Sequence, residues 1–480
     1  MTADYVAYHA ADRPDAVAVI HDGRTISFAQ FREDIRRAMR AVRELGPSRG
    51  GSIAVGADNL YLHWLLLLAC EQLGIAAASF LSGDALNCIP LLASVDLAVA
   101  EPECPIPAAK RRHALTRPWI QGVLARANEG EEPALPKTPD DPVRIVQTSG
   151  TTGANKRFLI TRRMHDSLNV QWRWVFGLDH RCRYLQTLPL VVRATYDLGS
   201  ACLRSGGTLV LESRMGAIEA LTAHSITHAI LLPVQLGGTM DHLAPDFAKP
   251  RELTIMSFGA TVSPTLREKV TARLAASLCD LYGTVEVAAV STIWRPDTDG
   301  FGTLLPQVQA EAVDDRDKPV PFGDMGRIRL KAAGMSEGYI DDPETTARLF
   351  RDGWFYPGDV GVIRPGRQLK IFGRADDLLN IGGQKFLPAV LEAWLLGQET
   401  AGDVGVCSLP NADGIEELCI AVAHVGHDDE ELMSRIQHAL RHVQVGRFRV
   451  VRLDRIPRSE NGKLRRKLLR EEVARAVVSR

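Results

Sequence analysis

The sequence predicts an α/β protein whose large domain contains doubly wound, largely parallel β-sheets. Short apolar runs rich in β-branched residues alternate with helical stretches from residue 143 to about residue 365, which is the pattern of repeated strand–helix–strand units. At 480 residues the chain is also longer than a single hydrophobic core usually supports. We therefore expect at least two domains, of which the larger contains the sheets.

The first part of the chain, up to about residue 140, mixes helices with short strands. In the stretch 27–45, apolar side chains recur at three- and four-residue spacing, as an amphipathic helix requires. Strands are expected at 16–20 and 52–55. The most apolar window, 61–80, is interrupted by polar residues, so we interpret it as a buried helix that leads into a strand and not as a membrane span.

Strands and helices alternate again in the second part of the chain. The expected strands are 143–146, 208–211, 228–232, 253–257 and 278–281, and the expected helices include 216–224 and 264–275. Ligands of doubly wound sheets bind beyond the carboxyl ends of the strands. The segments 148–153 and 282–286 each follow a strand, so we expect both to face one cleft.

The composition narrows the class of protein. A formal net charge of −1 gives no overall attraction to nucleic acid or to an anionic membrane, so neither partner is expected. None of the eight cysteines forms a Cys-x-x-Cys pair, which argues against a zinc site and against a disulfide framework. No charged segment followed by an apolar core opens the chain, so no secretory signal is expected. We expect a reduced, cytoplasmic, soluble protein.

The segment IVQTSGTTGANKR, from Ile145 to Arg157, has the features of a phosphate-binding loop. A strand leads into it, Gly150 and Gly153 allow close approach of the backbone to a ligand, and Lys156 closes it with a positive charge. Hydroxyl groups are able to converge on phosphate oxygens from Thr148, Ser149, Thr151 and Thr152. The alternative is a surface turn, which is typical of this composition. A Walker loop is excluded, because it needs Gly-Lys followed by Ser or Thr.

This segment resembles the phosphate loop of the adenylate-forming, or AMP-binding, superfamily. That superfamily includes acyl- and aryl-CoA synthetases, the adenylation domains of nonribosomal peptide synthetases, and luciferases. Further motifs of the family follow in the same order to the C-terminus, so the resemblance covers nearly the whole chain. It implies a large adenylation domain, 1–373, and a small mobile α+β domain, 374–480. It also implies that Thr152 is catalytic and that the other loop residues bind ATP.

Tyr282-Gly-Thr-Val-Glu286 is the second motif, and it resembles the family's Tyr-Gly-x-Thr-Glu. A carboxylate just beyond a strand is suited to holding Mg²⁺ through one contact. The resemblance implies that Tyr282, Gly283 and Thr284 bind ATP, and that Glu286 is catalytic and serves the metal. Val285 replaces a Thr that normally bonds the adenylate phosphate. The alternative for Glu286 is a solvated charge.

The segment from Asp352 to Asp359, DGWFYPGD, resembles the family's ribose motif. The resemblance assigns Asp359 to both ribose hydroxyls of ATP, and the alternative is a carboxylate in an Asx turn. Gly373-Arg-Ala-Asp-Asp377 follows. The resemblance to the family implies that Arg374 also contacts the ribose and that Asp376 is the hinge of the C-terminal domain.

Two motifs lie in the C-terminal part. Ile381-Gly-Gly-Gln-Lys385 resembles the glycine-rich strand beside the thiol tunnel, and glycines there permit close approach of a pantetheine arm. The tunnel residues implied are Gly382, Gly383 and Lys385. Pro457-Arg-Ser-Glu-Asn-Gly-Lys463 resembles the family's Pro-Arg-x-x-Asn-Gly-Lys, which implies that Lys463 orients the carboxylate and the α-phosphate. In isolation, a basic C-terminal helix indicates only a solvated face.

The acid pocket is predicted from two segments. Tyr196-Asp197 resembles the Phe-Asp of amino-acid adenylation domains, whose Asp holds the substrate ammonium. Alternatively, Asp197 is the N-cap of a helix over 198–204. Phe258, Gly259 and Ala260 resemble a pocket wall, and their apolar character suits an acyl or aryl group, although it suits a core strand equally.

The resemblance implies an AMP-forming acid–thiol ligase that works in two steps. A carboxylate attacks the α-phosphorus of ATP bound with Mg²⁺, which gives acyl-AMP and pyrophosphate, and a thiol then takes the acyl group. The expected thiol is coenzyme A, and the alternative is the phosphopantetheine of an acyl or peptidyl carrier protein. A third hypothesis is a catalytically weak binder of nucleotide or acyl group, suggested by Val285, Asn155 and Arg157. The sequence leaves the identity of the acid and the oligomeric state open.

Overall fold

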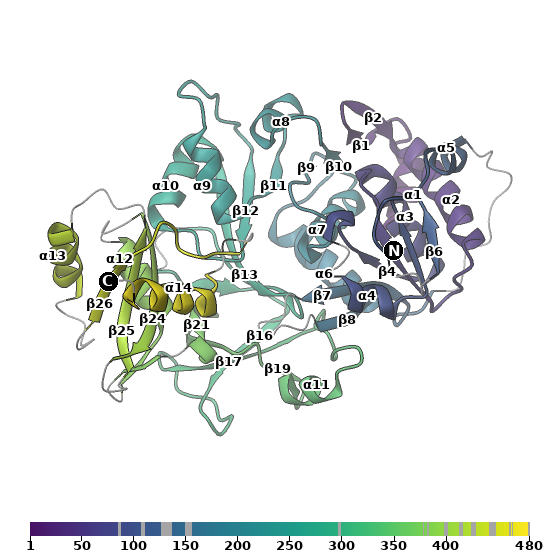
Figure 1. Ribbon diagram of the computed structural model, residues 1–480. Coiled ribbons are helices and arrows are strands. Elements are labelled where there is room, and N and C mark those ends of the chain that lie inside the picture. The colour runs from purple at the N-terminus through teal and green to yellow at the C-terminus, as the bar shows by residue number, and fades with distance from the viewer. Residues whose placement is uncertain are drawn as a thin grey trace.

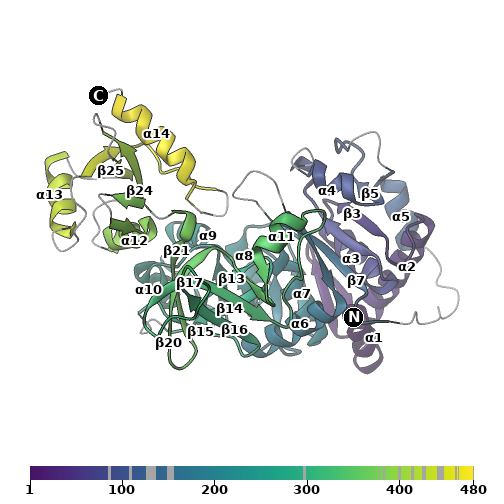
Figure 2. The same ribbon diagram turned by 90° about the horizontal axis from the view of Figure 1, so that it is seen from below.

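The computed structural model describes residues 1–480 apart from 85–87, 107–110, 126–136, 149–155, 296–298, 378, 382–383, 398–401, 412–415, 424–428, 441–447, 460–461, 463 and 479–480. The chain folds as an α/β protein with two large sheets and two small ones in the described part (Figure 1). The two large sheets and their helices form one body. The last hundred residues or so form a smaller body at its side, which is seen best after rotation (Figure 2).

A six-stranded sheet lies in the N-terminal half. Its order is β6 (Arg112–Ala114), β5 (Leu97–Ala100), β3 (Ser52–Gly56), β4 (Ala76–Ser79), β7 (Pro142–Thr148) and β8 (Lys156–Thr161). All neighbours are parallel except the β7–β8 hairpin. The apolar window predicted as a buried helix is α3 (Leu60–Leu73), which is capped by the Asn59 side chain and leads into β4. The sequence prediction is confirmed there.

The largest sheet has a parallel half and an antiparallel half. The parallel strands are β1 (Val17–His21), β10 (Thr208–Leu211), β9 (Arg183–Leu185), β11 (His228–Ile230), β12 (Thr254–Phe258) and β13 (Ser277–Thr284), with β2 (Arg24–Ser27) antiparallel at one edge. The antiparallel half comprises β14 (Ala288–Ile293), β15 (Gly302–Leu304), β16 (Val308–Val313), β17 (Met325–Ala332), β18 (Phe350–Arg351), β19 (Trp354–Phe355), β20 (Asp359–Arg364) and β21 (Gln368–Arg374).

The predicted parallel alternation therefore ends at β13 and does not continue to residue 365. Only residues 285–287 separate β13 from β14, and a turn of that length joins antiparallel strands because a parallel crossover needs a helix.

The helices of the large body cover the faces of these sheets. Besides α3, they are α1 (Thr2–Asp12), α2 (Phe28–Glu44), α4 (Ile89–Ser94), α5 (Arg117–Ala125), α6 (Arg162–Val175), α7 (Arg193–Arg204), α8 (Ala217–Ala223), α9 (Pro233–Asp241), α10 (Pro264–Arg273) and α11 (Pro343–Leu349), with a 3₁₀ turn η1 at Ser82–Asp84. The predicted helix 27–45 is α2, and the Ser27 hydroxyl caps it by accepting from the backbone N–H of Gln30.

The smaller body has its own apolar clusters. Its strands are β22 (Leu379–Ile381), β23 (Gln384–Phe386), β24 (Asp403–Pro410), β25 (Glu416–Ala423) and β26 (Phe448–Arg452), and its helices are α12 (Pro388–Gly397), α13 (Asp429–Leu440) and α14 (Arg466–Val478). One face of the β24–β25–β26 sheet packs on α12 and α13, and the other packs on α14. Within the described residues of the whole chain, no helix is both long and apolar enough to cross a bilayer.

Candidate active site

The site is organised around the turn between β13 and β14, which carries the motif 282–286. A Cβ atom at Gly283 would lie 2.1 Å from the carbonyl oxygen of Ala288, so no other residue fits between the two strands. The Thr284 hydroxyl accepts a 3.1 Å hydrogen bond from the backbone N–H of Val287 and closes the turn. These contacts place Tyr282 and Glu286 at the two ends of one tight bend.

Tyr282 reaches the predicted ribose motif. Its hydroxyl donates a 2.5 Å hydrogen bond to Oδ2 of Asp359, the first residue of β20. Burial, with the neighbouring Asp359 carboxylate, raises the pKa of the Tyr282 hydroxyl well above its usual value. Arg374 lies opposite Asp359 in the β20–β21 ladder, and its guanidinium lies 3.3 Å from Oδ1 of Asp359. The structure thus brings Tyr282, Asp359 and Arg374 together from three strands.

Glu286 forms a second cluster at the other end of the turn. Its Oε1 accepts a 2.7 Å hydrogen bond from the Tyr339 hydroxyl, and its backbone oxygen accepts from the N–H of Ser336. The Lys156 ammonium lies 5.3 Å from the centroid of the Tyr339 ring, within range of a cation–π contact. Tyr339 therefore connects the first residue of β8 with the motif carboxylate.

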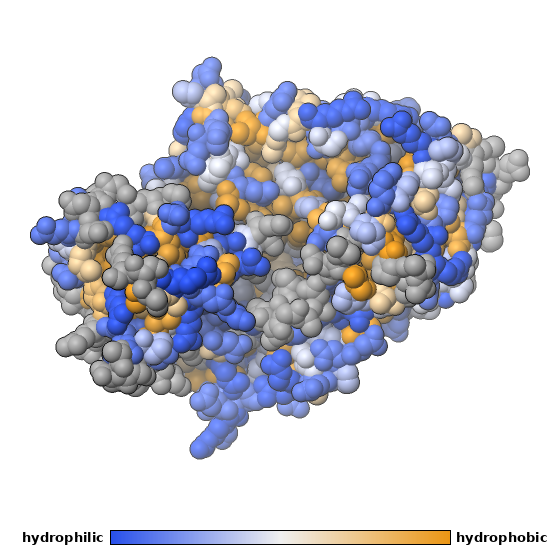
Figure 3. Space-filling view, in the orientation of Figure 1, coloured by the Kyte–Doolittle hydropathy of each residue, from blue (hydrophilic) through white to orange (hydrophobic). Residues whose placement is uncertain are grey.

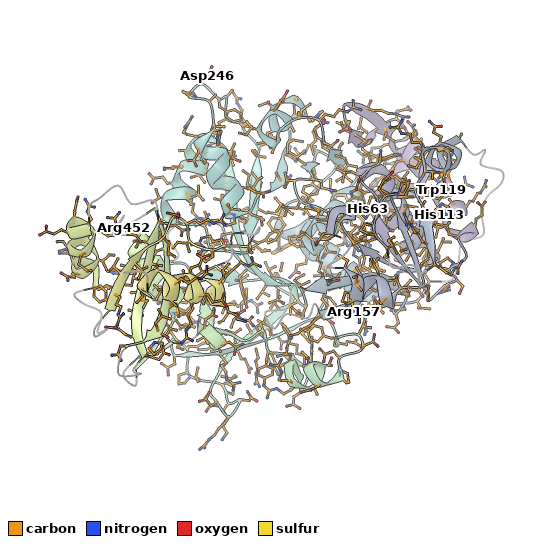
Figure 4. The ribbon with its side chains drawn as sticks, viewed as in Figure 1. His63, His113, Trp119, Arg157, Asp246 and Arg452 are labelled. Atoms are coloured by element: carbon orange, nitrogen blue, oxygen red, sulfur yellow. The ribbon has the colours of Figure 1, made fainter. Side chains whose placement is uncertain are left out.

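Arg157, labelled in Figure 4, holds this arrangement together from β8. Its backbone oxygen accepts a 2.6 Å hydrogen bond from the N–H of Ile340, and its guanidinium lies 3.4 Å from Asp341. The segment that carries Tyr339 is thus fixed against the hairpin that carries Lys156. Sequence reasoning gave Tyr339 no role, although an aromatic residue in a Gly-rich segment before the ribose motif was a usable signal.

Arg193 was also missed by sequence reasoning. It is the first residue of α7, it is 7% exposed, and its guanidinium donates to the backbone oxygen of Val285 and to Oδ2 of Asp197 at 3.2 Å. Burial lowers the pKa of Arg193, against the opposing effect of Asp197. An arginine directly after the apolar run 188–192 was the only signal in the sequence.

The predicted helix cap at Asp197 is wrong. Helix α7 begins at Arg193 and not at residue 198, so Asp197 lies inside the helix and caps nothing. Burial alone would raise the pKa of Asp197, but His165 and Arg193 outweigh it and lower that pKa. The Tyr196 hydroxyl donates a 2.7 Å hydrogen bond to the buried carboxylate of Glu71. Both predicted pocket residues therefore have partners within the protein.

The other predicted pocket segment ends a strand. Phe258 is the last residue of β12 and is half-buried, and Gly259 follows with φ of +94°, a conformation that favours glycine. Ala260 is also half-buried. Because β12 is hydrogen-bonded to β13 in parallel, this segment lies beside Tyr282 at the same edge of the sheet.

Two adjoining cavities open at the carboxyl ends of the parallel strands. One of about 350 Å³ is lined chiefly by apolar residues that follow β3, β4 and β9, and His63 is in its wall (Figure 4). The other, of about 380 Å³, lies between the ends of β9 to β11 and helices α8 and α9, where Figure 3 shows hydrophobic atoms in a hollow. Gln186, Thr187 and Glu212 line both cavities.

Several predicted residues fall wholly or partly outside the described residues. The predicted residues that lie outside the described part are Ser149, Gly150, Thr151, Thr152, Gly153, Gly382, Gly383 and Lys463. For Thr148 and Lys385 the structure describes the backbone but not the side chain. The backbone of Thr148 pairs with Lys156 at the end of the β7–β8 hairpin, as expected for a strand that leads into the loop. Gly462, next to Lys463, lies against α9, since a Cβ there would be 3.6 Å from that of Val234.

Asp376, the predicted hinge, lies between the two bodies. It is exposed in a single 3₁₀ turn, η2 (Ala375–Asp377), which directly follows the last strand of the large sheet. The next residue, Asp377, pairs at 2.9 Å with Arg466 of α14.

Comparison with known proteins agrees with this geometry. Residues 6–340 match the family model described as AMP-binding enzyme. The chain is 24% identical to indoleacetate–CoA ligase from Aromatoleum aromaticum, over 98% of each protein. ATP-bound MatB from Rhodopseudomonas palustris has the same fold, with a TM-score of 0.86, 22% identity and coverage of 98% and 99% of the two chains. O-succinylbenzoate coenzyme A synthetase (MenE) from Bacillus subtilis, solved with ATP and magnesium ion, gives a TM-score of 0.83, 19% identity and the same coverage. The chain belongs to the AMP-binding enzyme family.

Proposed function

We propose that this protein is an ATP-dependent acid–CoA ligase that activates a carboxylic acid as an acyl-adenylate and transfers the acyl group to coenzyme A. The observation that carries this proposal is the meeting of two polar clusters in the turn 282–286. Tyr282 holds Asp359 at one end of the turn, and Glu286 holds Tyr339 beside Lys156 at the other. The coenzyme A ligases among its relatives support the choice of acceptor.

In the first step, the substrate carboxylate oxygen attacks the α-phosphorus of ATP and pyrophosphate leaves. Asp359 and Arg374 hold the ribose hydroxyls, and Lys156 with the loop 149–155 holds phosphate oxygens. Lys463 neutralises the charge that develops between the carboxylate and the α-phosphate, and electrostatic stabilisation of this kind commonly contributes more to catalysis than any other single effect. The contact of Gly462 with α9 supports an approach of this lysine to the large domain.

The residues present fit a magnesium ion at Glu286. Oε1 is bonded to Tyr339, whereas Oε2 receives no hydrogen bond from the described residues, and one carboxylate contact is typical of Mg²⁺ bound with a nucleotide. When bound, the ion neutralises the phosphate oxygens of ATP.

In the second step, the coenzyme A thiol takes the acyl group and AMP leaves. The predicted boundary at 373/374 falls one residue before the end of β21, and we place it directly after Arg374, because β21 is the last strand of the large sheet and β22 pairs with β23. Rotation about Asp376 would withdraw Lys463 and bring Gly382 and Gly383 to the thiol. The carrier-protein alternative loses its main support, since Asp197 is paired with Arg193 and is not free for a substrate ammonium.

The experiment that tests this function measures pyrophosphate release from ATP with pools of fatty, aryl, amino and short polar acids, with and without coenzyme A. We expect release that rises with coenzyme A, and we expect Lys463→Ala to reduce adenylation at least about 100-fold. Lys467→Ala, an exposed lysine of α14, is the matched control. Equal rates in Lys463→Ala and wild type would disprove the role of Lys463, and release indifferent to coenzyme A would favour a carrier protein.

A further inference from the structure

The parallel strands of the large sheet end in a row at one edge. Their order is β13, β12, β11, β9 and β10, and every neighbouring pair in this series is parallel. Because parallel strands point the same way, the residues at their carboxyl ends form a line across the sheet. From Tyr282 near the end of β13, this line runs through Phe258, Leu231 and Gln186 to Glu212, which directly follows β10.

The two adjoining cavities open at the end of this line that is remote from the motif turn. Leu231 lines the cavity of about 380 Å³, and Gln186 and Glu212 line both that cavity and the one of about 350 Å³. Both volumes are in the range of pockets that bind small ligands. With neighbouring strands about 4.8 Å apart, Glu212 lies roughly 14 Å along the line from the end of β12. A ligand that reaches from the motif turn to Glu212 is therefore elongated.

The larger cavity begins beside the helix that the C-terminal motif approaches. Gln235, in the first turn of α9, lines this cavity, and the preceding residue, Val234, lies against Gly462. Gly462 directly precedes Lys463, the lysine that we assign to adenylation. An acid with its carboxylate at this lysine would therefore have its carbon chain at the mouth of the cavity. The apolar side chains of the cavity wall include Leu185, Met215, Ala220 and Leu231.

Glu212 supplies a hydrogen-bond acceptor where the two cavities adjoin. Its side chain is 2% exposed, its Oε1 accepts a 2.9 Å hydrogen bond from the backbone N–H of Arg214, and its Oε2 lies 3.2 Å from Nε2 of His224. An ionised carboxylate has about four acceptor positions and no donor. Two of these positions are used by the described residues, so the carboxylate is able to accept a further hydrogen bond from a ligand in the cavities.

Gln186 supplies a hydrogen-bond donor in the same walls. Its Oε1 accepts a 2.8 Å hydrogen bond from the indole N–H of the buried Trp64, and because an indole N–H only donates, this contact fixes which end of the amide is the oxygen. The amide NH₂ group donates to none of the residues that the structure describes. An acceptor and a donor together match a hydroxyl group, which both donates and accepts. A carboxylate would be repelled by Glu212, and an ammonium group has no acceptor for the N–H groups of Gln186.

We propose that Glu212 and Gln186 bind a hydroxyl group at the end of the substrate that is remote from its carboxylate, so that the acid activated is an elongated hydroxy acid. This inference rests on the proposed function and specifies its substrate class. Glu212 accepts the hydroxyl hydrogen, Gln186 donates to the hydroxyl oxygen, and the apolar residues of the larger cavity contact the carbon chain. Both polar residues act on specificity and do not touch the reacting atoms.

The test compares acids that differ only at the remote end. Pyrophosphate release by the wild-type enzyme is measured with decanoic, dodecanoic and para-substituted phenylpentanoic acids, each with a hydroxyl, a fluorine or an amino group at that end. Fluorine is close to a hydroxyl group in size but donates no hydrogen bond. We expect kcat/KM to be at least about 10-fold higher for one hydroxy acid than for its fluoro and amino counterparts, since hydrogen bonds to a charged group are strong.

Variants of Glu212 then identify the residue responsible. We expect Glu212→Leu to lower kcat/KM for the hydroxy acid at least about 10-fold and to change that for the fluoro acid less than about threefold. Glu212→Gln keeps an acceptor oxygen and should retain part of the preference. The matched control is Glu219→Leu, because Glu219 is exposed on α8 and lines neither cavity. It removes the same charge without changing the ratio of hydroxy to fluoro acid.

The wild-type comparison needs no variant, so the inference stays testable if Glu212→Leu does not fold. Equal kcat/KM for hydroxy and fluoro acids would overturn the inference and retain the proposed function, and so would release with other acid pools but with none of these acids. A higher value for an amino counterpart would overturn the assignment of a hydroxyl group. Silence with every acid pool would overturn both the inference and the proposed function.

Discussion

Four acidic residues near α7 and the motif turn illustrate two contrasting regions. Asp359 and Glu286 stand at the ends of a turn and bond Tyr282 and Tyr339 from neighbouring strands. Glu71 and Asp197 lie deeper and are surrounded by basic side chains. The first pair connects strands that we propose hold the nucleotide, whereas the second pair balances charge inside the core. The same side chain is thus expected to affect catalysis in one region and stability in the other.

The substitution Glu71→Gln has the largest expected effect, and it tests whether the carboxylates of the core region act on stability. The substitution removes the charge beside Arg204, and the single amide oxygen replaces two acceptors, one for the Tyr196 hydroxyl and one for the N–H of Thr2. We therefore expect the free energy of unfolding to fall by about 3 kcal/mol. Activity per folded molecule should stay within about threefold of wild type. Urea denaturation measures the first quantity. The exposed Glu219→Gln should change stability by less than about 0.5 kcal/mol. An unchanged midpoint in Glu71→Gln would contradict the structural role.

Asp359→Asn has the next largest effect and tests the other region. The amide oxygen is still able to accept from Tyr282, but the charge beside Arg374, at the proposed ribose site, is lost. We expect kcat/KM for ATP to fall about 100-fold with stability changed by less than about 1 kcal/mol. Asp352→Asn is the control in the same motif, because Asp352 has φ of +51° and asparagine tolerates that conformation. A large loss of stability with normal ATP kinetics would show that Asp359 stabilises the fold and does not act in ATP binding.

The effect that is smallest near neutral pH is a pH dependence of stability caused by His63. Burial lowers the pKa of His63 to about 4, so the folded protein stays neutral there while the unfolded chain takes up a proton below about pH 6.5. The unfolded state binds more protons between these values, and stability is therefore lost as the pH falls through this window. We expect His63→Gln to weaken the dependence. Identical slopes of unfolding free energy against pH in variant and wild type would show that His63 does not cause it.

The sequence predicted the fold well where local patterns decide it. The periodicity of 27–45 gave α2 and the apolar window 61–80 gave α3 and β4, because burial on one side or on all sides is visible in the residue order. The antiparallel half of the large sheet was not predicted. Its strands have the same β-branched character as parallel ones, and only the shortness of the turn 285–287 distinguishes them.

The sequence predicted those residues of the site that belong to recognisable motifs. Tyr282, Asp359 and Arg374 meet, although 77 residues separate the first two, since Tyr282 lies near the end of β13, Asp359 begins β20 and Arg374 ends β21. Tyr339 and Arg193 were not predicted to take part. Their roles depend on contacts between distant segments, and a single tyrosine or arginine has no local pattern that reveals its partner. Asp197 was misjudged for the same reason, because the start of α7 is not marked by a capping residue.

The smaller body, with apolar clusters on both faces of its three-stranded sheet, has a consequence for how the enzyme can be assembled. The large body and the smaller body each bury their own apolar side chains. The peptide bond near Ala375 therefore serves mainly to keep the two bodies at a high local concentration. Two separate polypeptides, one ending and the other starting there, would then rebuild an active enzyme when mixed, with a rate that depends on their concentration. Lys463 would then act on a substrate that is bound to a separate polypeptide.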